Sequence, residues 1–147
     1  MGYYMRYIVS DDRTIGLEDI RAVFAQAGTG YEVEGEEVGA TIAYEGKPIG
    51  HVTLNVPGDV LFDEERDELI EFAQDGNNKS AKDRVINTLR VARAIVAVQV
   101  LFGDGDSDRT LDRLIPLWTW LQANRHGLVQ ADGEGYYDGQ ELILALD

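Results

Sequence analysis

The stretch that most constrains the fold is Ala94-Ile-Val-Ala-Val-Gln-Val-Leu-Phe102, in which Gln99 is the one polar residue. A short run that is rich in β-branched residues and followed by glycine is typical of a strand buried on both faces. Neither glycine nor proline separates this run from the segment before it, so one continuous helix over 80–101 is the alternative. We interpret the run as a central strand around which the other segments pack.

Apolar periodicity predicts the remaining elements. Spacings of three or four residues indicate helices, and alternation of apolar and polar residues indicates half-buried strands. Gly28 stands where a glycine commonly ends a helix, and Pro116 lies inside the last helical pattern, where it predicts a kink or a break. The predicted elements are a strand over 3–9, a helix over 15–27, a three-stranded antiparallel meander over 31–56, a helix over 64–74 capped by Asp63, a helix over 80–92, the strand over 94–102, a helix capped by Ser107 or Asp108 and ended by Gly127, and strands over 128–131 and 141–146.

This order, β-α-β-β-β-α-α-β-α-β-β, predicts an α+β fold with a mainly antiparallel sheet and helices packed on one face. The chain has 147 residues, which is the size of one ordinary domain, and we expect a single domain over 1–147. In a general way the order is similar to that of ferredoxin-like sandwiches, but a fold alone does not carry a function.

The strongest feature of the composition is a formal net charge of −14. Binding to a phosphate backbone or an anionic membrane surface depends on basic residues, so we expect neither nucleic acid nor a membrane as a direct partner. The chain has no cysteine, which excludes disulfides and thiolate metal sites. The first residues lack the pattern of a signal peptide. We therefore expect a cytoplasmic protein without a cofactor.

An acid-rich turn follows the central run. Asp104, Asp106 and Asp108 have the spacing of the first, third and fifth positions of a calcium-binding EF-hand loop. The match fails further on, because Arg109 replaces the glycine of the sixth position and Ile115 replaces the glutamate of the twelfth. We interpret these acids as the polar start of a helix, where negative charge is favourable, and keep a divalent-cation site as the alternative.

A second group of acids, Asp132, Glu134 and Asp138, lies beside glycines in segments predicted to be turns. Paired carboxylates act as acid and base only where their surroundings separate their pKa values. Exposed turns do not provide such surroundings. The histidines lack metal-ligand spacing, no serine lies in a Gly-x-Ser-x-Gly motif, and no glycine-rich phosphate loop is present. We assign no catalytic residue, and a carboxylate-based enzyme or small-ligand binder is the second hypothesis.

Two surface features favour binding over catalysis. Trp120 lies opposite the apolar stripe of the last helix, near Arg113 and Asn124, and an outward tryptophan is a typical interface anchor. The alternatives are that a kink at Pro116 turns Trp120 into the core, or that another element covers it. A basic strip on the 80–92 helix is the second feature, and it consists of Lys79, Lys82, Arg90 and Arg93. The alternative for this strip, which we favour, is ordinary solvation and pairing with the neighbouring acidic helix.

We therefore expect a protein-interaction module. An inhibitor-type or immunity-type binder of a basic partner is one form of this hypothesis, because the chain is strongly acidic. A homodimer in which the basic strip meets an acidic surface is the other form.

Overall fold

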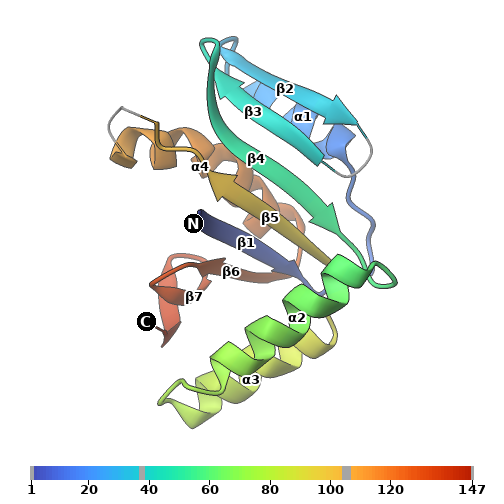
Figure 1. The fold of residues 1–147 in the computed structure, drawn as a ribbon, viewed down its shortest axis with the longest axis vertical. Coiled ribbons are helices and arrows are strands. Elements are labelled where there is room, and N and C mark those ends of the chain that lie inside the picture. The colour runs from blue at the N-terminus through green and yellow to red at the C-terminus, as the bar shows by residue number, and fades with distance from the viewer. Residues whose placement is uncertain (1, 37–38, 104–106, 147) are drawn as a thin grey trace.

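An eight-stranded antiparallel sheet runs through the molecule, with its strands in the order β2-β3-β4-β5-β1-β6-β7-β8. Figure 1 shows the strands from β2 to β7 in this order. The computed structural model describes residues 2–36, 39–103 and 107–146. Its strands are β1 (Tyr3–Val9), β2 (Tyr31–Glu36), β3 (Gly39–Tyr44), β4 (Lys47–Asn55), β5 (Ala94–Val100), β6 (Gly127–Ala131), β7 (Gly135–Asp138) and β8 (Glu141–Ala145). Its helices are α1 (Leu17–Ala27), α2 (Val60–Ala73), α3 (Lys79–Arg90) and α4 (Ser107–Asn124).

The apolar run forms the strand β5, which pairs with β4 on one side and with β1 on the other. Val96 and Val98 belong to one hydrophobic cluster, and Ile95 and Ala97 belong to a second cluster on the opposite face of the sheet. The prediction of a central strand buried on both faces is confirmed. The alternative of one continuous helix is wrong, because α3 ends at Arg90 and the chain then enters the sheet.

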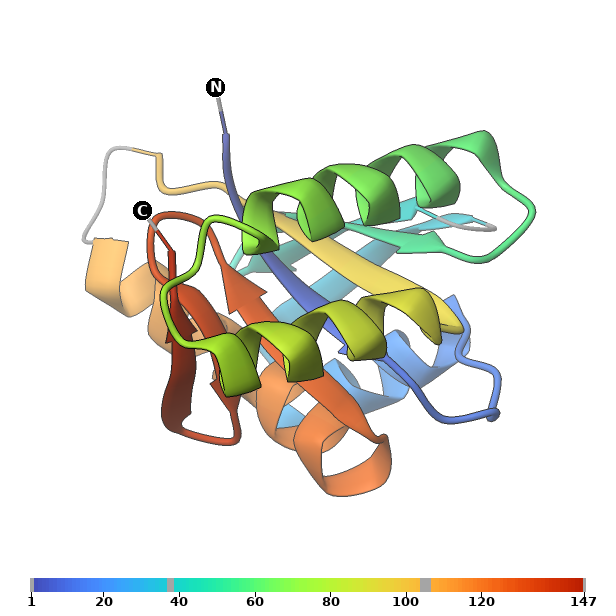
Figure 2. The same cartoon turned by 90° about the horizontal axis from the view of Figure 1, so that it is seen from below.

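The helices cover both faces of the sheet. α1 and α4 supply the first cluster with residues such as Phe24 and Leu117, and α2 and α3 supply the second with residues such as Phe62 and Leu89. Figure 2 shows α2 and α3 side by side over the face of the sheet that carries the second cluster. The α+β class and the antiparallel sheet are confirmed, but the helices do not share one face as predicted. The reason is β5 itself, since a strand that is apolar on both faces needs cover on both.

Three local features differ from the prediction. Residues 135–138 form the strand β7 between β6 and β8, although they were predicted as part of a turn. Asp59 precedes the first residue of α2, so this helix starts before Asp63. Gly28 is extended, with φ 167°, and does not have the left-handed conformation of a typical glycine cap.

The helix α4 continues through Pro116 without a break. Proline removes one helical hydrogen bond, but Leu114, Leu117 and Leu121 bury an apolar stripe against the first cluster on either side of it. This burial outweighs the lost bond. Neither α4 nor any other helix in the described ranges is long and apolar enough to span a membrane.

The helix α2 is less firmly packed than the others. Its buried residues are Phe62 and Ala73, and it packs principally against α3. Between α2 and the strands β1 and β4, the surface is hollowed.

Candidate functional site

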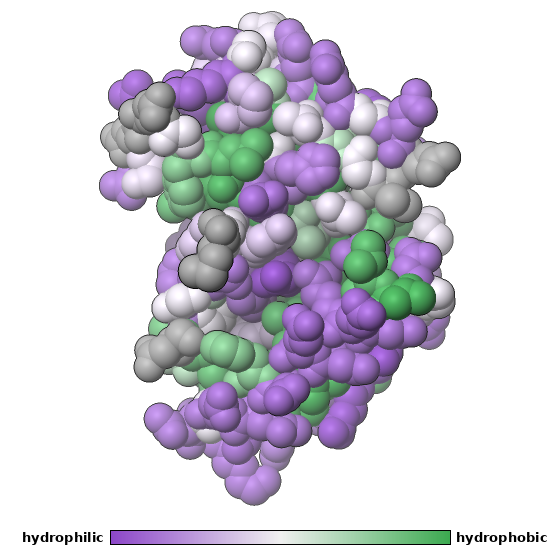
Figure 3. Space-filling view, in the orientation of Figure 1, coloured by the Kyte–Doolittle hydropathy of each residue, from purple (hydrophilic) through white to green (hydrophobic). Residues whose placement is uncertain are grey.

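A groove of about 630 Å³ lies between α2 and the adjoining face of the sheet. We call it the α2 groove; its lining includes Leu61, Glu68 and Phe72 from α2, Arg6 and Tyr136 from the sheet, and Asp132 from the turn after β6. In the space-filling view, the α2 surface is mainly hydrophilic, with separate apolar patches (Figure 3). A cavity of this size accepts several side chains of a partner or a small ligand.

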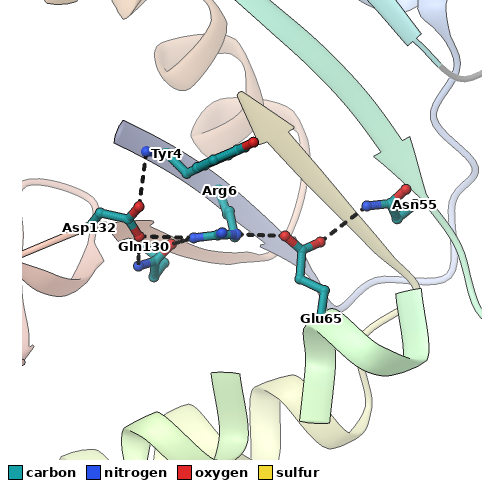
Figure 4. A network of polar contacts seen from close by, with 6 residues as sticks. All are labelled: Tyr4, Arg6, Asn55, Glu65, Gln130 and Asp132. Carbon is teal, nitrogen blue, oxygen red and sulfur yellow. Dashed lines mark hydrogen bonds and ion pairs between the residues drawn. The ribbon is translucent and has the colours of Figure 1, made fainter. Parts of the chain in front are cut away.

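Arg6 lies on the floor of the groove and joins three elements. It is the one charged residue of β1. Alternation along the strand directs it to the face opposite the buried Tyr7, because successive side chains point to opposite faces. Its Nε donates to Oε2 of Glu65 at 2.7 Å, and its Nη1 donates to Oε1 of Gln130 at 2.6 Å and to Oδ1 of Asp132 at 3.1 Å. Figure 4 shows the guanidinium between the two carboxylates, one from α2 and one from the end of β6.

Further hydrogen bonds fix both carboxylates. Oε1 of Glu65 accepts from Asn55 of β4 at 3.1 Å. Oδ2 of Asp132 accepts from the backbone N–H of Tyr4 at 3.0 Å, and its Oδ1 also accepts from Nε2 of Gln130 at 3.0 Å. Each of the four carboxylate oxygens therefore accepts at least one hydrogen bond. A network whose members are satisfied holds its residues in one arrangement.

The electrostatic character of the groove is negative. Burial lowers the pKa of Arg6, but the hydrogen bond and charge of Glu65, together with Asp132, outweigh burial and leave the pKa above its ordinary value. Arg6 is thus always a cation, and it is the one basic residue in the lining. The acidic residues of the lining are Glu64, Glu65, Glu68 and Asp132. Glu64 and Glu68 are exposed and form no ion pair with a described residue.

Tyr136 of β7 lines the same groove and is 1% exposed. Its hydroxyl has no hydrogen-bond partner among the residues that the structure describes. Burial raises the pKa of this hydroxyl, Arg6 lowers it, and Glu65 and Asp132 raise it, with a net shift upward. The hydroxyl is therefore protonated at neutral pH and able to donate.

The acids predicted at 132–138 do not converge on one point. Asp132 belongs to the Arg6 network. Glu134 accepts hydrogen bonds from the hydroxyls of Tyr3 and Tyr137, at 2.9 and 2.6 Å. Asp138 forms an ion pair of 2.7 Å with an arginine of α3. Each acid thus has its own partner within the chain.

The calcium-like acids are described only in part. Asp104 and Asp106 lie outside the described residues, and Asp108 lies in the first turn of α4. Within the described ranges, no three His, Asp or Glu side chains gather as they would to hold a metal ion.

The predicted binding residues of α4 make contacts within the chain. Trp120 is half-buried against the first cluster, and the guanidinium of Arg125 lies 5.1 Å from its ring centre. Asn124 donates to the carbonyl oxygen of Trp120 at 2.9 Å. Arg113 stacks over the ring of Tyr44 at 4.0 Å. Trp120 is therefore neither in the core nor fully outward.

Two residues of the basic strip have partners within the chain, and the other two contact no described acid. Lys79 pairs with Asp83 at 3.1 Å, and Lys82 donates to a backbone carbonyl at 3.4 Å. Arg90 and Arg93 are exposed, and their side chains contact no described acid. The strip does not line the α2 groove.

Sequence reasoning missed Arg6, Glu65 and Tyr136. A signal was present for Arg6, because a lone charge inside an apolar strand requires a buried partner or an open face. A signal was also present for Tyr136, since two adjacent tyrosines suit a strand better than a turn. Glu65 gave no signal, being one of several acids on its helix.

Comparisons with known proteins add no residue to this site. No protein-family model, curated protein or solved structure matches the chain.

Proposed function

We propose that this protein is an interaction module that binds a basic, partly apolar segment of another protein in the α2 groove. The observation that carries the proposal is the exposed side of α2, where Leu61 and Phe72 are 64% and 52% exposed. Beside them lie Glu64 and Glu68, which are exposed and form no ion pair with a described residue. Large apolar side chains exposed at the edge of a groove are typical of binding surfaces.

Charge decides which kind of partner suits this surface. The groove lining carries four acidic residues against one basic residue, and the whole chain has a net charge of −14. Opposite charge speeds the encounter of two proteins and rejects partners of like charge. A segment that alternates lysine or arginine with apolar residues would match both the acids and the exposed Leu61 and Phe72.

The proposal is tested with a fluorescent peptide of alternating lysine and leucine, whose binding is followed by fluorescence anisotropy. Changing Glu64→Gln and Glu68→Gln together is expected to weaken binding about fivefold, since exposed ion pairs contribute modestly. The affinity of the unchanged protein is expected to fall as salt is added, because salt screens exposed charges.

The matched control is the double variant Glu32→Gln and Glu34→Gln. These acids are exposed on the edge strand β2, so the net charge changes equally while the groove stays intact. Equal weakening in both double variants would contradict the proposal, because net charge alone would then attract the peptide. Equally tight binding of a glutamate–leucine peptide would contradict it as well.

A further inference from the structure

The Tyr136 hydroxyl differs from the other buried polar groups of the groove. Among the described residues, three buried side-chain atoms lack a hydrogen-bond partner: Nε1 of Trp118, Nε of Arg125 and the hydroxyl oxygen of Tyr136. Of the three residues, Tyr136 is the one that lines the α2 groove. A buried hydroxyl without a partner destabilises a fold, and phenylalanine would fill the same space without that cost.

The hydroxyl lacks a partner although polar groups are close by. Glu65 and Asp132 influence its pKa, but their oxygens accept hydrogen bonds from Arg6, Asn55, Gln130 and Tyr4 and none from this hydroxyl. Within the described part of the chain, Nη2 of Arg6 also donates no hydrogen bond. Among the described residues, the floor of the groove thus keeps two donors without an acceptor, the Tyr136 hydroxyl and Nη2 of Arg6.

Donors on the floor select an acceptor on the occupant. A carboxylate is disfavoured there, because four acidic residues line the groove. A carbonyl oxygen accepts hydrogen bonds and carries no net negative charge. Every residue of a protein segment has one on its backbone. Resting on the proposed function, we infer that the Tyr136 hydroxyl is a binding group that donates to a backbone carbonyl of the basic segment. The hydroxyl is shielded from solvent in the free protein, so lining side chains must move as the segment enters.

The test is Tyr136→Phe, which removes the hydroxyl alone. Binding of the lysine–leucine peptide is expected to weaken about tenfold, the effect of losing one buried hydrogen bond. The midpoint of thermal unfolding of the free protein is expected to stay unchanged or to rise. A hydroxyl with a purely structural role would give the opposite pattern, a lower midpoint with unchanged binding.

Tyr7→Phe is the matched control for stability. Tyr7 is 2% exposed, and its hydroxyl donates to the backbone carbonyl of Arg125 at 2.9 Å. Removing this satisfied hydroxyl is expected to lower the unfolding midpoint. A drop of the same size in Tyr136→Phe would overturn the inference.

The carbonyl is identified by replacing the backbone oxygens of the peptide, one at a time, with sulfur, which is a weaker acceptor. One such peptide is expected to bind the unchanged protein more weakly but to bind Tyr136→Phe without further loss. If Tyr136→Phe binds every peptide as the unchanged protein does, while the Glu64 and Glu68 double variant binds more weakly, the inference fails and the proposed function stands. If neither variant weakens binding, the proposed function fails.

Discussion

Replacing Arg6 with methionine is expected to lower the free energy of unfolding by about 2–3 kcal/mol, measured by urea denaturation at neutral pH. The change leaves Glu65 and Asp132 without their counter-ion. Because these side chains are only 18% and 36% exposed, water replaces the counter-ion poorly. Removing one member of a fully buried ion pair costs about 3–5 kcal/mol. Because Asp132 is partly exposed, the cost of removing Arg6 lies at or below the lower end of this range. Methionine keeps most of the apolar stem of Arg6, so little of the loss comes from packing.

Arg66→Met is the control for this effect. Arg66 pairs with Asp63 and Asp67 on the surface of α2, and these acids are 51% and 69% exposed. Its replacement is expected to cost about 0.5 kcal/mol or less, since water solvates the acids that remain. An equal loss in the two variants would contradict the structural role that we assign to the Arg6 network.

The Arg6 variant should also loosen α2. The helix buries Phe62 and Ala73 and is tied to β1 through Glu65. Segments with few buried contacts open locally at low cost. Backbone amides of α2 are therefore expected to exchange with solvent faster in Arg6→Met than in the unchanged protein, measured by hydrogen–deuterium exchange. The exchange of the α4 amides is expected to change less.

Local pattern was enough to predict most of the fold. The meander β2-β3-β4 follows from alternation over 31–56, and β5 follows from its β-branched run. The error lay in combining these correct elements. A strand that is apolar at both Val96 and Ile95 already requires helices on both faces, so the one-faced arrangement contradicted the prediction for β5.

The site could be predicted far less well than the fold. Asp132 was singled out as an acid, but its partner Arg6 is 126 residues away along the chain. Which strand lies beside β1 is decided by the whole sheet, and no local spacing encodes it. The strand β7 was missed because the glycines around its two tyrosines are typical of turns, and with it Tyr136 was missed.

Replacing Gly127 with alanine is expected to cost at least about 3 kcal/mol, although the residue lies outside the α2 groove. A Cβ atom added at Gly127 would lie 2.0 Å from the carbonyl oxygen of Ile8 in the neighbouring strand β1. Backbone cannot yield as a flexible side chain does, so β6 must move away from β1. Urea denaturation measures the loss, and Gly28→Ala is the control, because Gly28 has an extended backbone and its added Cβ would approach ring atoms of Tyr31 no closer than 3.9 Å.

The same displacement should reach the groove, because β6 carries Gln130 and is followed by Asp132, the two residues that hold Nη1 of Arg6. The NMR resonance of the Arg6 Nε–H group reports on this network and is expected to shift in Gly127→Ala but not in Gly28→Ala. The arrangement of Gln130 and Asp132 around Arg6 thus depends on the close approach of β6 to β1. If Gly127→Ala were as stable as the unchanged protein and left this resonance in place, the two strands would not lie as close as the structure has them. The arrangement of Gln130 and Asp132 around Arg6 would then lose its basis.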